Sequence, residues 1–291
     1  MTTAAVVQVV VSGLATGSVY GLMALSLVII YNATRTLNFA QGEMLMVSTF
    51  VAWSVYHAGL PLLVSAVAAV LAAAVLAFLC ERLIVRRTLA ATHWDVLIIT
   101  LGLSLMLRAG AGLVWSHDEF PFPSFFSNRP IALGPVRLAP VSLGIIAASL
   151  ALMLALAALF RWTRLGRAMR AVAQNPRAAR LMGISVERVY SYAWVLAAVV
   201  GAVAGVLVAP VVFLSSKMGL LVINGFTAAV LGGFGSMPGA VVGGMLLGVL
   251  ENLAPLYLPS SIRYAVPFVA LVAILLVRPA GLLGRVEQRK V

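Results

Sequence analysis

The densest group of side chains that could bind another molecule lies between residues 161 and 189. This stretch holds seven arginines and one acidic residue, Glu187, and long apolar runs lie on both sides of it. Because a charge buried in hydrocarbon is costly, we expect the stretch to connect two membrane helices through water. Its positive charge favours the cytoplasmic side of the membrane.

A short helix is predicted in the middle of this connection. Asn175 is a good N-cap, and Pro176 follows at the first helical position, where a missing N–H does no harm. About two turns over residues 177–182 would end at Gly183 in the left-handed conformation. Ser185 could then cap the helix that re-enters the membrane.

The predicted short helix would carry an apolar face with a basic rim. Ala178, Leu181 and Met182 share that face by their spacing, and Arg177 and Arg180 lie beside it. A rigid helix of this kind, held off the membrane, is suited to a groove on a partner protein. The alternative is a solvated basic loop that only sets orientation, and the stretch alone leaves both interpretations open.

The composition is that of a membrane protein. Of 291 residues, 63% are hydrophobic and only 10% are charged, whereas about a quarter of a soluble domain is charged. Several apolar runs reach the roughly 20 residues that span a bilayer. We therefore expect an all-α polytopic membrane protein with a single transmembrane domain over residues 1–291. No basic residue precedes Arg35, so the first apolar run is expected to be retained rather than cleaved as a signal peptide.

About eight long helices are expected, together with one half-helix. Glycines interrupt the segment 219–256, which predicts a half-helix over 225–231 and a helix that returns to about residue 253. A broken helix inside a membrane is tolerated only where it is buried in protein or lines a cavity. The residues assigned to this break and its packing are Gly232, Gly233, Gly235, Gly239 and Gly243. The other long helices are expected over about 5–30, 42–56, 62–79, 96–115, 141–160, 189–213 and 263–277.

Two stripes run along the first predicted helix. Gly13, Gly17 and Gly21 recur every four residues, which predicts close approach of another helix. Beside them lies a polar stripe that predicts a face turned to a translocation pathway or to the protein interior. Plain helix packing is the alternative, and it is favoured for the glycines. The polar stripe consists of Gln8, Ser12, Thr16 and Tyr20.

Three polar residues stand at the start of the second predicted helix. Asn38 and Gln41 fit a capping box, and Glu43 would lie in the first turn, where the helix dipole favours a negative charge. Capping alone would explain all three residues. They could also line the inner mouth of a pathway or its gate. Arg108, inside the fourth predicted helix, is expected to face protein or to extend to the membrane surface.

The distribution of basic residues predicts the orientation. With the N-terminus outside and the broken segment as a return pair, fifteen of the twenty basic residues fall on the inner side and four on the outer side, and Arg108 lies within the membrane. This bias supports an N-out, C-in topology. It also explains the net charge of +12 without nucleic acid.

The sequence lacks the motifs of several chemistries. Neither Lys217 nor Lys290, the two lysines, lies in a phosphate-binding G-x-x-x-x-G-K-[ST] motif, so the chain is not expected to hydrolyse ATP. Cys80 is the single cysteine, and the three histidines are scattered, so neither a metal site nor a catalytic residue is predicted. Intramembrane carboxylates are scarce, which weighs against a proton- or sodium-coupled carrier.

Four stretches together resemble the branched-chain amino-acid ABC permease family of the LivH type. They are GLATGSVYGLMALSLVIIYNATRTLNFAQGEMLM, RAVAQNPRAARLMGISVERVY, GFTAAVLGGFGSMPGAVVGG and LLVRPAGLLG, and the resemblance covers nearly the whole chain. The second stretch also resembles the importer pattern E-A-A-x-x-x-G, through Ala178, Ala179 and Gly183. Arg177 stands where that pattern has glutamate, so a salt bridge based on that glutamate is not expected.

The resemblance implies a permease subunit of a binding-protein-dependent ABC importer in a bacterial-type inner membrane. Its implied partners are a second permease subunit, two ATPase subunits that bind ATP and Mg, and an extracytoplasmic binding protein. This chain would then be neither an enzyme nor a cofactor carrier. The residues implied in coupling to the ATPases are Asn175, Pro176, Arg177, Ala178, Arg180, Leu181, Met182, Gly183 and Ile184.

The implied substrates are branched-chain or other hydrophobic amino acids, moved by alternating access. Urea, short amides or another small solute stay open within the same family. A stand-alone secondary transporter that uses the broken segment is a further alternative, and a membrane scaffold without transport is the least favoured.

Overall fold

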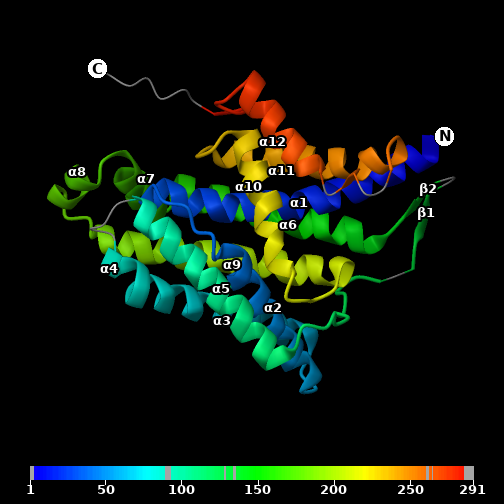
Figure 1. Ribbon diagram of the computed structural model, residues 1–291, viewed down its shortest axis with the longest axis horizontal. Helices are drawn as coiled ribbons and strands as arrows, with labels where there is room; N and C mark the ends of the chain where they lie inside the picture. The colour runs from blue at the N-terminus through cyan, green and yellow to red at the C-terminus, as the bar shows by residue number, and fades with distance from the viewer. Residues whose placement is uncertain are drawn as a thin grey trace. The chain divides into compact units, whose positions relative to one another are not determined.

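The computed structural model describes residues 3–88, 93–127, 129–133, 136–259, 262–263 and 265–284, and Figure 1 shows that they are mostly helical. The basic tail residues Arg285, Arg289 and Lys290 lie outside the described residues. The longer helices are α1 (Thr3–Thr34), α2 (Gln41–His57), α3 (Leu62–Cys80), α5 (His93–Trp115), α6 (Pro140–Trp162), α7 (Arg164–Gln174), α9 (Val186–Val212), α10 (Leu221–Gly232), α11 (Met237–Leu253) and α12 (Val266–Val277). The short elements are a π-helix, η1 (Glu81–Val85), α4 (Arg86–Thr88), α8 (Pro176–Leu181), the one-turn helices η2 (Met218–Leu220) and η3 (Ala254–Leu256), and an antiparallel hairpin of β1 (Ile131–Leu133) and β2 (Val136–Leu138).

Among the described residues, six helices are long and apolar enough to cross a membrane. This confirms a multi-pass α-helical membrane protein. The expected number of eight long spanning helices is not confirmed, since α2, α10 and α12 are shorter, and the N-out, C-in orientation stays a prediction. The six candidate spans are Ala5–Thr34, Leu62–Val85, Asp95–Trp115, Pro140–Trp162, Val186–Val212 and Met237–Leu256.

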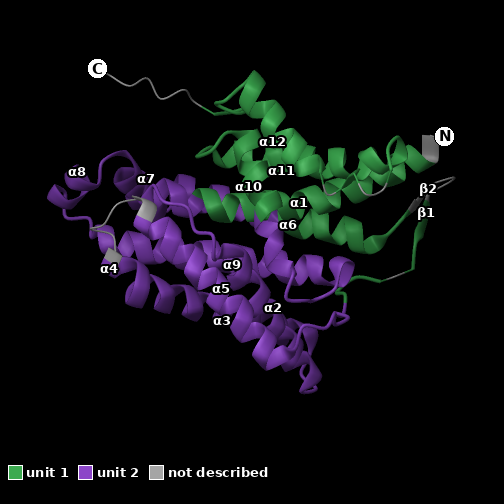
Figure 2. Cartoon of the chain, in the orientation of Figure 1, with its two compact units in different colours: residues 1–28, 124–150, 223–291 green, residues 29–123, 151–222 purple. Residues whose placement is uncertain are grey.

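The chain divides into two compact units, which Figure 2 colours separately. Unit 1 contains residues 1–28, 124–150 and 223–291, and unit 2 contains residues 29–123 and 151–222. Each unit is therefore assembled from segments far apart in the sequence. That the whole chain acts as a single transmembrane domain stays a prediction.

Within unit 2, α3 packs against α2 and α9 and presents two different faces. Small side chains recur every four residues on the buried face, which lets neighbouring helices approach closely. Larger apolar side chains recur with the same period on the exposed face, and an apolar outer surface is the one that lipid requires. The buried face consists of Ser65, Ala69, Ala73 and Ala77, and the exposed face of Leu63, Val67, Leu71 and Val75.

Within unit 1, the glycine stripe of α1 lies directly against the backbone of α11. A Cβ atom added at Gly17 would stand 2.8 Å from the Met245 Cα, and one added at Gly13 would stand 2.8 Å from the Val249 Cα. Gly21 lies against Gly244 in the same contact. The two helices approach so closely that only hydrogen fits at these positions.

The broken segment is interrupted over residues 233–236, between α10 and α11. Gly233 and Gly235 have positive φ angles of 107° and 96°, which favour glycine. The Ser236 hydroxyl then caps α11 by accepting a hydrogen bond of 3.1 Å from the Gly239 amide. Gly232 packs against the Gly239 backbone, and Gly243 packs against Gly232.

The predicted start of the half-helix at residue 225 is wrong. α10 begins at Leu221, because the one-turn helix η2 leads directly into it. Gly225 therefore lies inside the helix, where its missing side chain leaves room for Met23 of α1.

Candidate functional site

The basic connection folds into two helices, one of which sequence reasoning missed. α7 begins after Thr163, whose hydroxyl accepts a hydrogen bond of 3.0 Å from the Gly166 amide. Met169 and Val172 of α7 are buried. The signal that could have revealed this helix is the spacing of three between the exposed residues Arg164, Arg167 and Arg170, which is typical of the polar face of an amphipathic helix.

The short helix α8 has the predicted ends. The Asn175 side-chain oxygen accepts hydrogen bonds of 3.0 Å from the amides of Arg177 and Ala178, and Pro176 occupies the first turn. Gly183 follows the helix with a φ of 79°. The Ile184 amide donates to the Ala179 carbonyl at 3.0 Å, which fixes the turn that leads towards α9. Both ends of α8 are therefore set by local hydrogen bonds.

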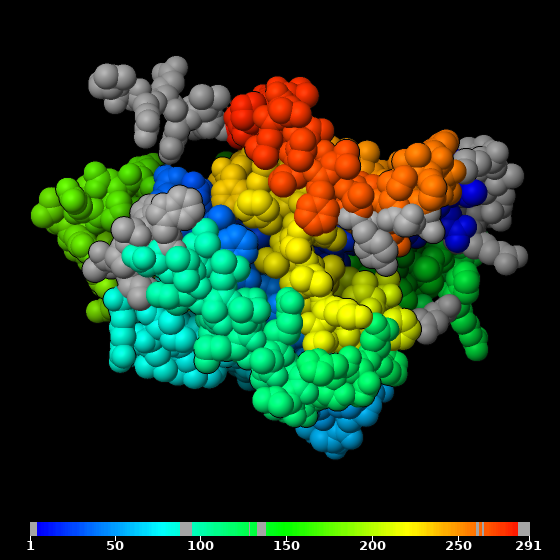
Figure 3. All heavy atoms as spheres, viewed as in Figure 1, coloured from blue at the N-terminus to red at the C-terminus, as the bar shows by residue number. Residues whose placement is uncertain are grey.

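Leu181 of α8 and Met182, which follows it, point away from the protein. Leu181 is 89% exposed and Met182 is 81% exposed, and Ala178 is exposed beside them. Ala179, by contrast, is buried against the rest of unit 2. Figure 3 shows this part of the chain as a lobe at the left edge of the molecule. The predicted apolar face is thus free to contact another protein.

Ser185 precedes α9 as its N-cap residue, but its side chain makes no capping hydrogen bond. The first turn of α9 is held differently. Glu187 accepts a hydrogen bond of 2.8 Å from Arg180 of α8, an ion pair in which both side chains are about half exposed. The backbone carbonyl of the same Glu187 faces a network of polar contacts just after the C-terminal end of α3.

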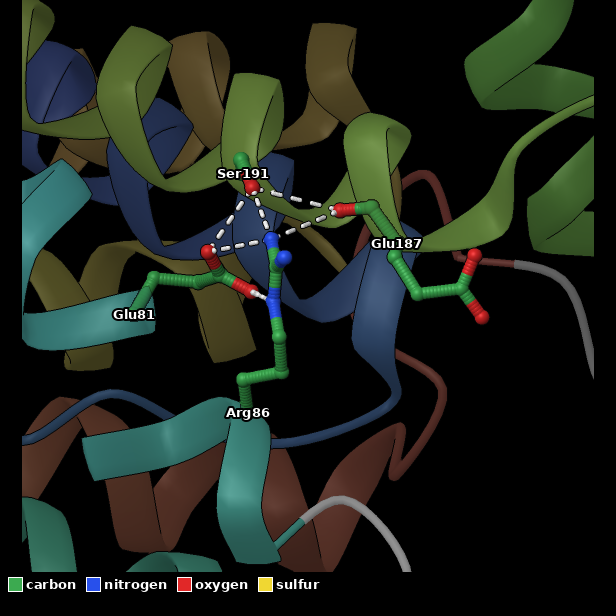
Figure 4. A network of polar contacts seen from close by, with 4 residues as sticks. All are labelled: Glu81, Arg86, Glu187 and Ser191. Atoms are coloured by element: carbon green, nitrogen blue, oxygen red, sulfur yellow. Dashed lines mark hydrogen bonds and ion pairs between the residues drawn. The ribbon is translucent and has the colours of Figure 1, made fainter. Parts of the chain in front are cut away.

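That network joins η1 and α4, which follow α3 in the chain, to α9, and it was not predicted from the sequence (Figure 4). Arg86 donates to both carboxylate oxygens of the buried Glu81, at 3.1 Å and 2.9 Å. Arg86 also donates to the Ser191 hydroxyl and, at 3.4 Å, to the Glu187 carbonyl. The Ser191 hydroxyl in turn donates to Glu81 at 2.7 Å. Glu81 and Arg86 lie five residues apart, but their partners Glu187 and Ser191 lie about a hundred residues further along the chain, where no local pattern could reveal them.

The four residues of the polar stripe of α1 differ in how far they are buried. Gln8 is exposed, Ser12 and Thr16 are half-buried, and Tyr20 is buried. The Thr16 hydroxyl donates to the Ser12 carbonyl at 3.1 Å, which satisfies it within the helix. Tyr20 lies beside Glu251 and Asn224, which belong to other helices of unit 1.

The three polar residues before and within α2 are all buried in unit 2. The predicted capping box is wrong: the N-cap is Ala40, whose amide donates to the Asn38 side chain at 3.0 Å. Asn38 and Gln41 do meet, at 3.3 Å, and Gln41 then donates to the Ala197 carbonyl of α9 at 2.8 Å. Glu43 lies in the first turn of α2, as predicted, and pairs with Arg108 of α5. Whether these residues line a pathway stays a prediction.

The apolar spans, with the exposed helix α8 between two of them, define a multi-pass α-helical membrane protein. Among the described residues, no group of three or more histidine, cysteine, aspartate or glutamate side chains could hold a metal ion. The sequence profile of a family described as "Branched-chain amino acid transport system / permease component" matches residues 9–275. The chain belongs to this family.

Relatives match along almost the whole chain. The chain is 34% identical to the "High-affinity branched-chain amino acid transport system permease protein LivH" of Escherichia coli K12, and the match covers 98% of this chain and 97% of that protein. It is 30% identical to the corresponding protein BraD of Pseudomonas aeruginosa, with the same coverage. It is also 30% identical to the "Nucleoside ABC transporter permease protein NupC" of Lactococcus lactis, over 51% of this chain and 50% of that protein.

A solved structure has a similar fold. The structure is that of "PsaBC from Streptococcus pneumoniae in complex with Fab", and the TM-score is 0.53. The match covers 91% of this chain and 89% of the other, at 14% sequence identity. At this identity the likeness concerns the fold alone.

Proposed function

We propose that this chain is the membrane-spanning permease subunit of a binding-protein-dependent ABC importer for branched-chain or other hydrophobic amino acids. Family membership and the names of the full-length relatives support this substrate class. The structural observation that carries the coupling role is α8, a capped helix whose two apolar side chains, Leu181 and Met182, stand in water.

The proposed assembly has four kinds of subunit. A second permease subunit, related or identical, completes the translocation pathway. Two ATPase subunits bind ATP and Mg and contact α8 from the cytoplasmic side, and an extracytoplasmic protein delivers the substrate. The chain itself carries no cofactor and no catalytic residue, and it resides in a bacterial-type inner membrane with its N-terminus outside.

The proposed mechanism is alternating access between two states. Closure of the ATPase pair on ATP displaces the segment from Asn175 to Ile184. Because α8 leads into α9 through a short turn, this displacement changes the packing of the membrane helices and opens the pathway to the outside. Hydrolysis then resets the inward-open state.

The test is uptake by the complete complex in sealed vesicles. Radiolabelled leucine, isoleucine and valine should accumulate only when the binding protein is outside and ATP is inside with the ATPases. A nucleoside serves as the competing substrate, because one relative bears that name over half of the chain. Uptake that proceeds without the ATPases and collapses with an uncoupler would instead establish a secondary transporter.

A further inference from the structure

The Glu81–Arg86 pair is a bidentate ion pair in unit 2 with a buried carboxylate. Glu81 is 0% exposed, and a buried carboxylate requires a partner that also fills its hydrogen-bonding positions. Arg86 supplies two parallel hydrogen bonds, and Ser191 of α9 supplies a third. The Glu81 carboxylate, in the π-helix η1 that follows α3, thus accepts two hydrogen bonds from α4 and one from α9.

The π-helix between the two residues explains why this pair can form. In a regular α-helix, residues five positions apart point about 140° away from one another, since one turn takes 3.6 residues. A π-helix, whose hydrogen bonds run from residue i to i+5, turns more slowly and brings such residues towards one side. The π-helix Glu81–Val85 therefore lets both Glu81 and Arg86 face Ser191. Such insertions are frequently found at functional sites.

Glu187 connects this contact to the short helix α8. Its side chain accepts from Arg180 of α8, while its backbone carbonyl accepts from Arg86. The first contact is exposed to water, so it is weak and exchangeable. The contact between Glu81 and Arg86 is buried on the carboxylate side and holds firmly. A movement of α8 that is transmitted through Glu187 therefore reaches the contact between Glu81, Arg86 and Ser191, which lies one turn further along α9.

We propose that Glu81, Arg86 and Ser191, here called the α3–α9 clamp, are positioning residues for coupling. The clamp fixes the inner ends of α3 and α9 to each other, so that a displacement of α8 moves both helices as one body. This inference rests on the proposed function, because it assumes that α8 is the segment that the ATPases displace.

Arg86→Lys tests the clamp in the reconstituted complex. Lysine keeps the positive charge but lacks the planar guanidinium group, whose several N–H donors contact Glu81 and Ser191 at the same time. The matched control is Arg87→Lys, at the exposed neighbouring arginine. The readout is the number of ATP molecules hydrolysed per substrate transported, which a loss of folded complex would not change.

We expect this ratio to rise about fivefold or more in Arg86→Lys, in the range of typical coupling effects, and to stay constant in Arg87→Lys. A ratio in Arg86→Lys equal to that of the unmodified complex overturns the clamp, even if the yield of complex falls. If the unmodified complex itself shows no ATP-driven uptake, the proposed function fails as well, so the two failures are distinguishable.

A distance measurement provides the second test. Spin labels at the exposed positions Arg82 and Arg188, in a Cys80→Ala background without the native cysteine, report the separation of α3 and α9. We expect the same distance distribution with and without ATP when the clamp is intact, and a broader, ATP-dependent one in Arg86→Lys. A distance that changes on ATP binding while the clamp is intact would rule out movement as one body.

Discussion

Arg108, in the middle of the apolar helix α5, forms an ion pair with Glu43 in the first turn of α2. The Arg108 Nε lies 3.1 Å from a carboxylate oxygen of Glu43, and the Glu43 side chain is almost completely buried. Glu43 also lies directly against Gly219 of η2, where a side chain would leave it no room. The pair therefore links two helices of unit 2 and places a charge where water cannot stabilise it.

Removal of the arginine should destabilise the protein more than removal of both charges. Arg108→Leu leaves Glu43 buried without its partner, at an expected cost of about 3 kcal/mol in the free energy of unfolding. The double variant Glu43→Gln and Arg108→Leu removes the unpaired charge and should recover most of that loss. Thermal unfolding of the purified protein in detergent measures both. A single variant as stable as the double variant would contradict the role of the ion pair.

The close contact of α1 with α11 predicts opposite effects for two glycines inside helices. Gly17→Ala places a Cβ against the α11 backbone, where overpacking should cost about 1–3 kcal/mol. Gly110→Ala, in α5, meets no atom within 4 Å and should be neutral or gain up to about 1 kcal/mol. Comparison of the two unfolding midpoints separates the effect of the α1–α11 contact from the general effect of alanine on helix stability. Equal midpoints would contradict the close contact at Gly17.

The exposed apolar side chains of α8 should matter for transport and not for folding. Leu181→Asp and Met182→Asp each place a charge where the side chain already stands in water, so the unfolding midpoint should not change. ATP-driven uptake should fall at least about tenfold, because loss of a hot-spot anchor at an interface costs about 2 kcal/mol of binding or more. Leu181→Met, which keeps an apolar side chain, is the control. Full uptake by both aspartate variants would contradict the proposed docking of α8 on an ATPase subunit.

Two glycines with positive φ offer a matched test of the turn after α8. Gly183 and Gly59 have φ angles of 79° and 89°, and neither has an atom within 4 Å of an added Cβ. Alanine at either position should cost about 1–2 kcal/mol of backbone strain. Only Gly183→Ala should also lower ATP-driven uptake, and Gly183→Pro should abolish it with membrane insertion intact. Equal uptake by the two alanine variants would count against a role in transport for the turn after α8.

The N-terminal cap of α8 makes a prediction that needs no transport assay. Asn175→Ala removes the acceptor for the Arg177 and Ala178 amides and should destabilise the helix by about 1 kcal/mol. Hydrogen exchange over residues 177–182 should then accelerate several-fold. Asn175→Asp keeps the acceptor and should exchange as the unmodified chain does. Unchanged exchange in the alanine variant would show that the cap is not needed.

Local signals were sufficient to predict the ends of α8. Asn175, Pro176 and Gly183 act on backbone groups within three or four residues, so their roles follow from residue type and spacing. The glycine stripe of α1 was likewise visible as a period of four. The sequence could not say which helix meets that stripe, because the choice of α11 depends on packing.

Long-range pairing and non-standard helix geometry account for what was missed. Glu81 and Arg86 lie five residues apart, and a π-helix has no sequence pattern that would place them on one side. The predicted capping box failed because the Asn38 side chain contacts Gln41 and the Ala40 amide instead of a helix N-terminus that starts at residue 39. Ala40 is therefore the N-cap, and α2 begins at Gln41.

The water-exposed tip of α8 has a consequence for how the protein is made. Leu181 and Met182 are adjacent apolar side chains that are almost fully exposed, and exposed apolar surface favours self-association. A subunit synthesised in excess of whatever covers this tip carries that hazard until it is degraded. If an ATPase subunit covers α8 as proposed, balanced production of the two chains would limit this self-association.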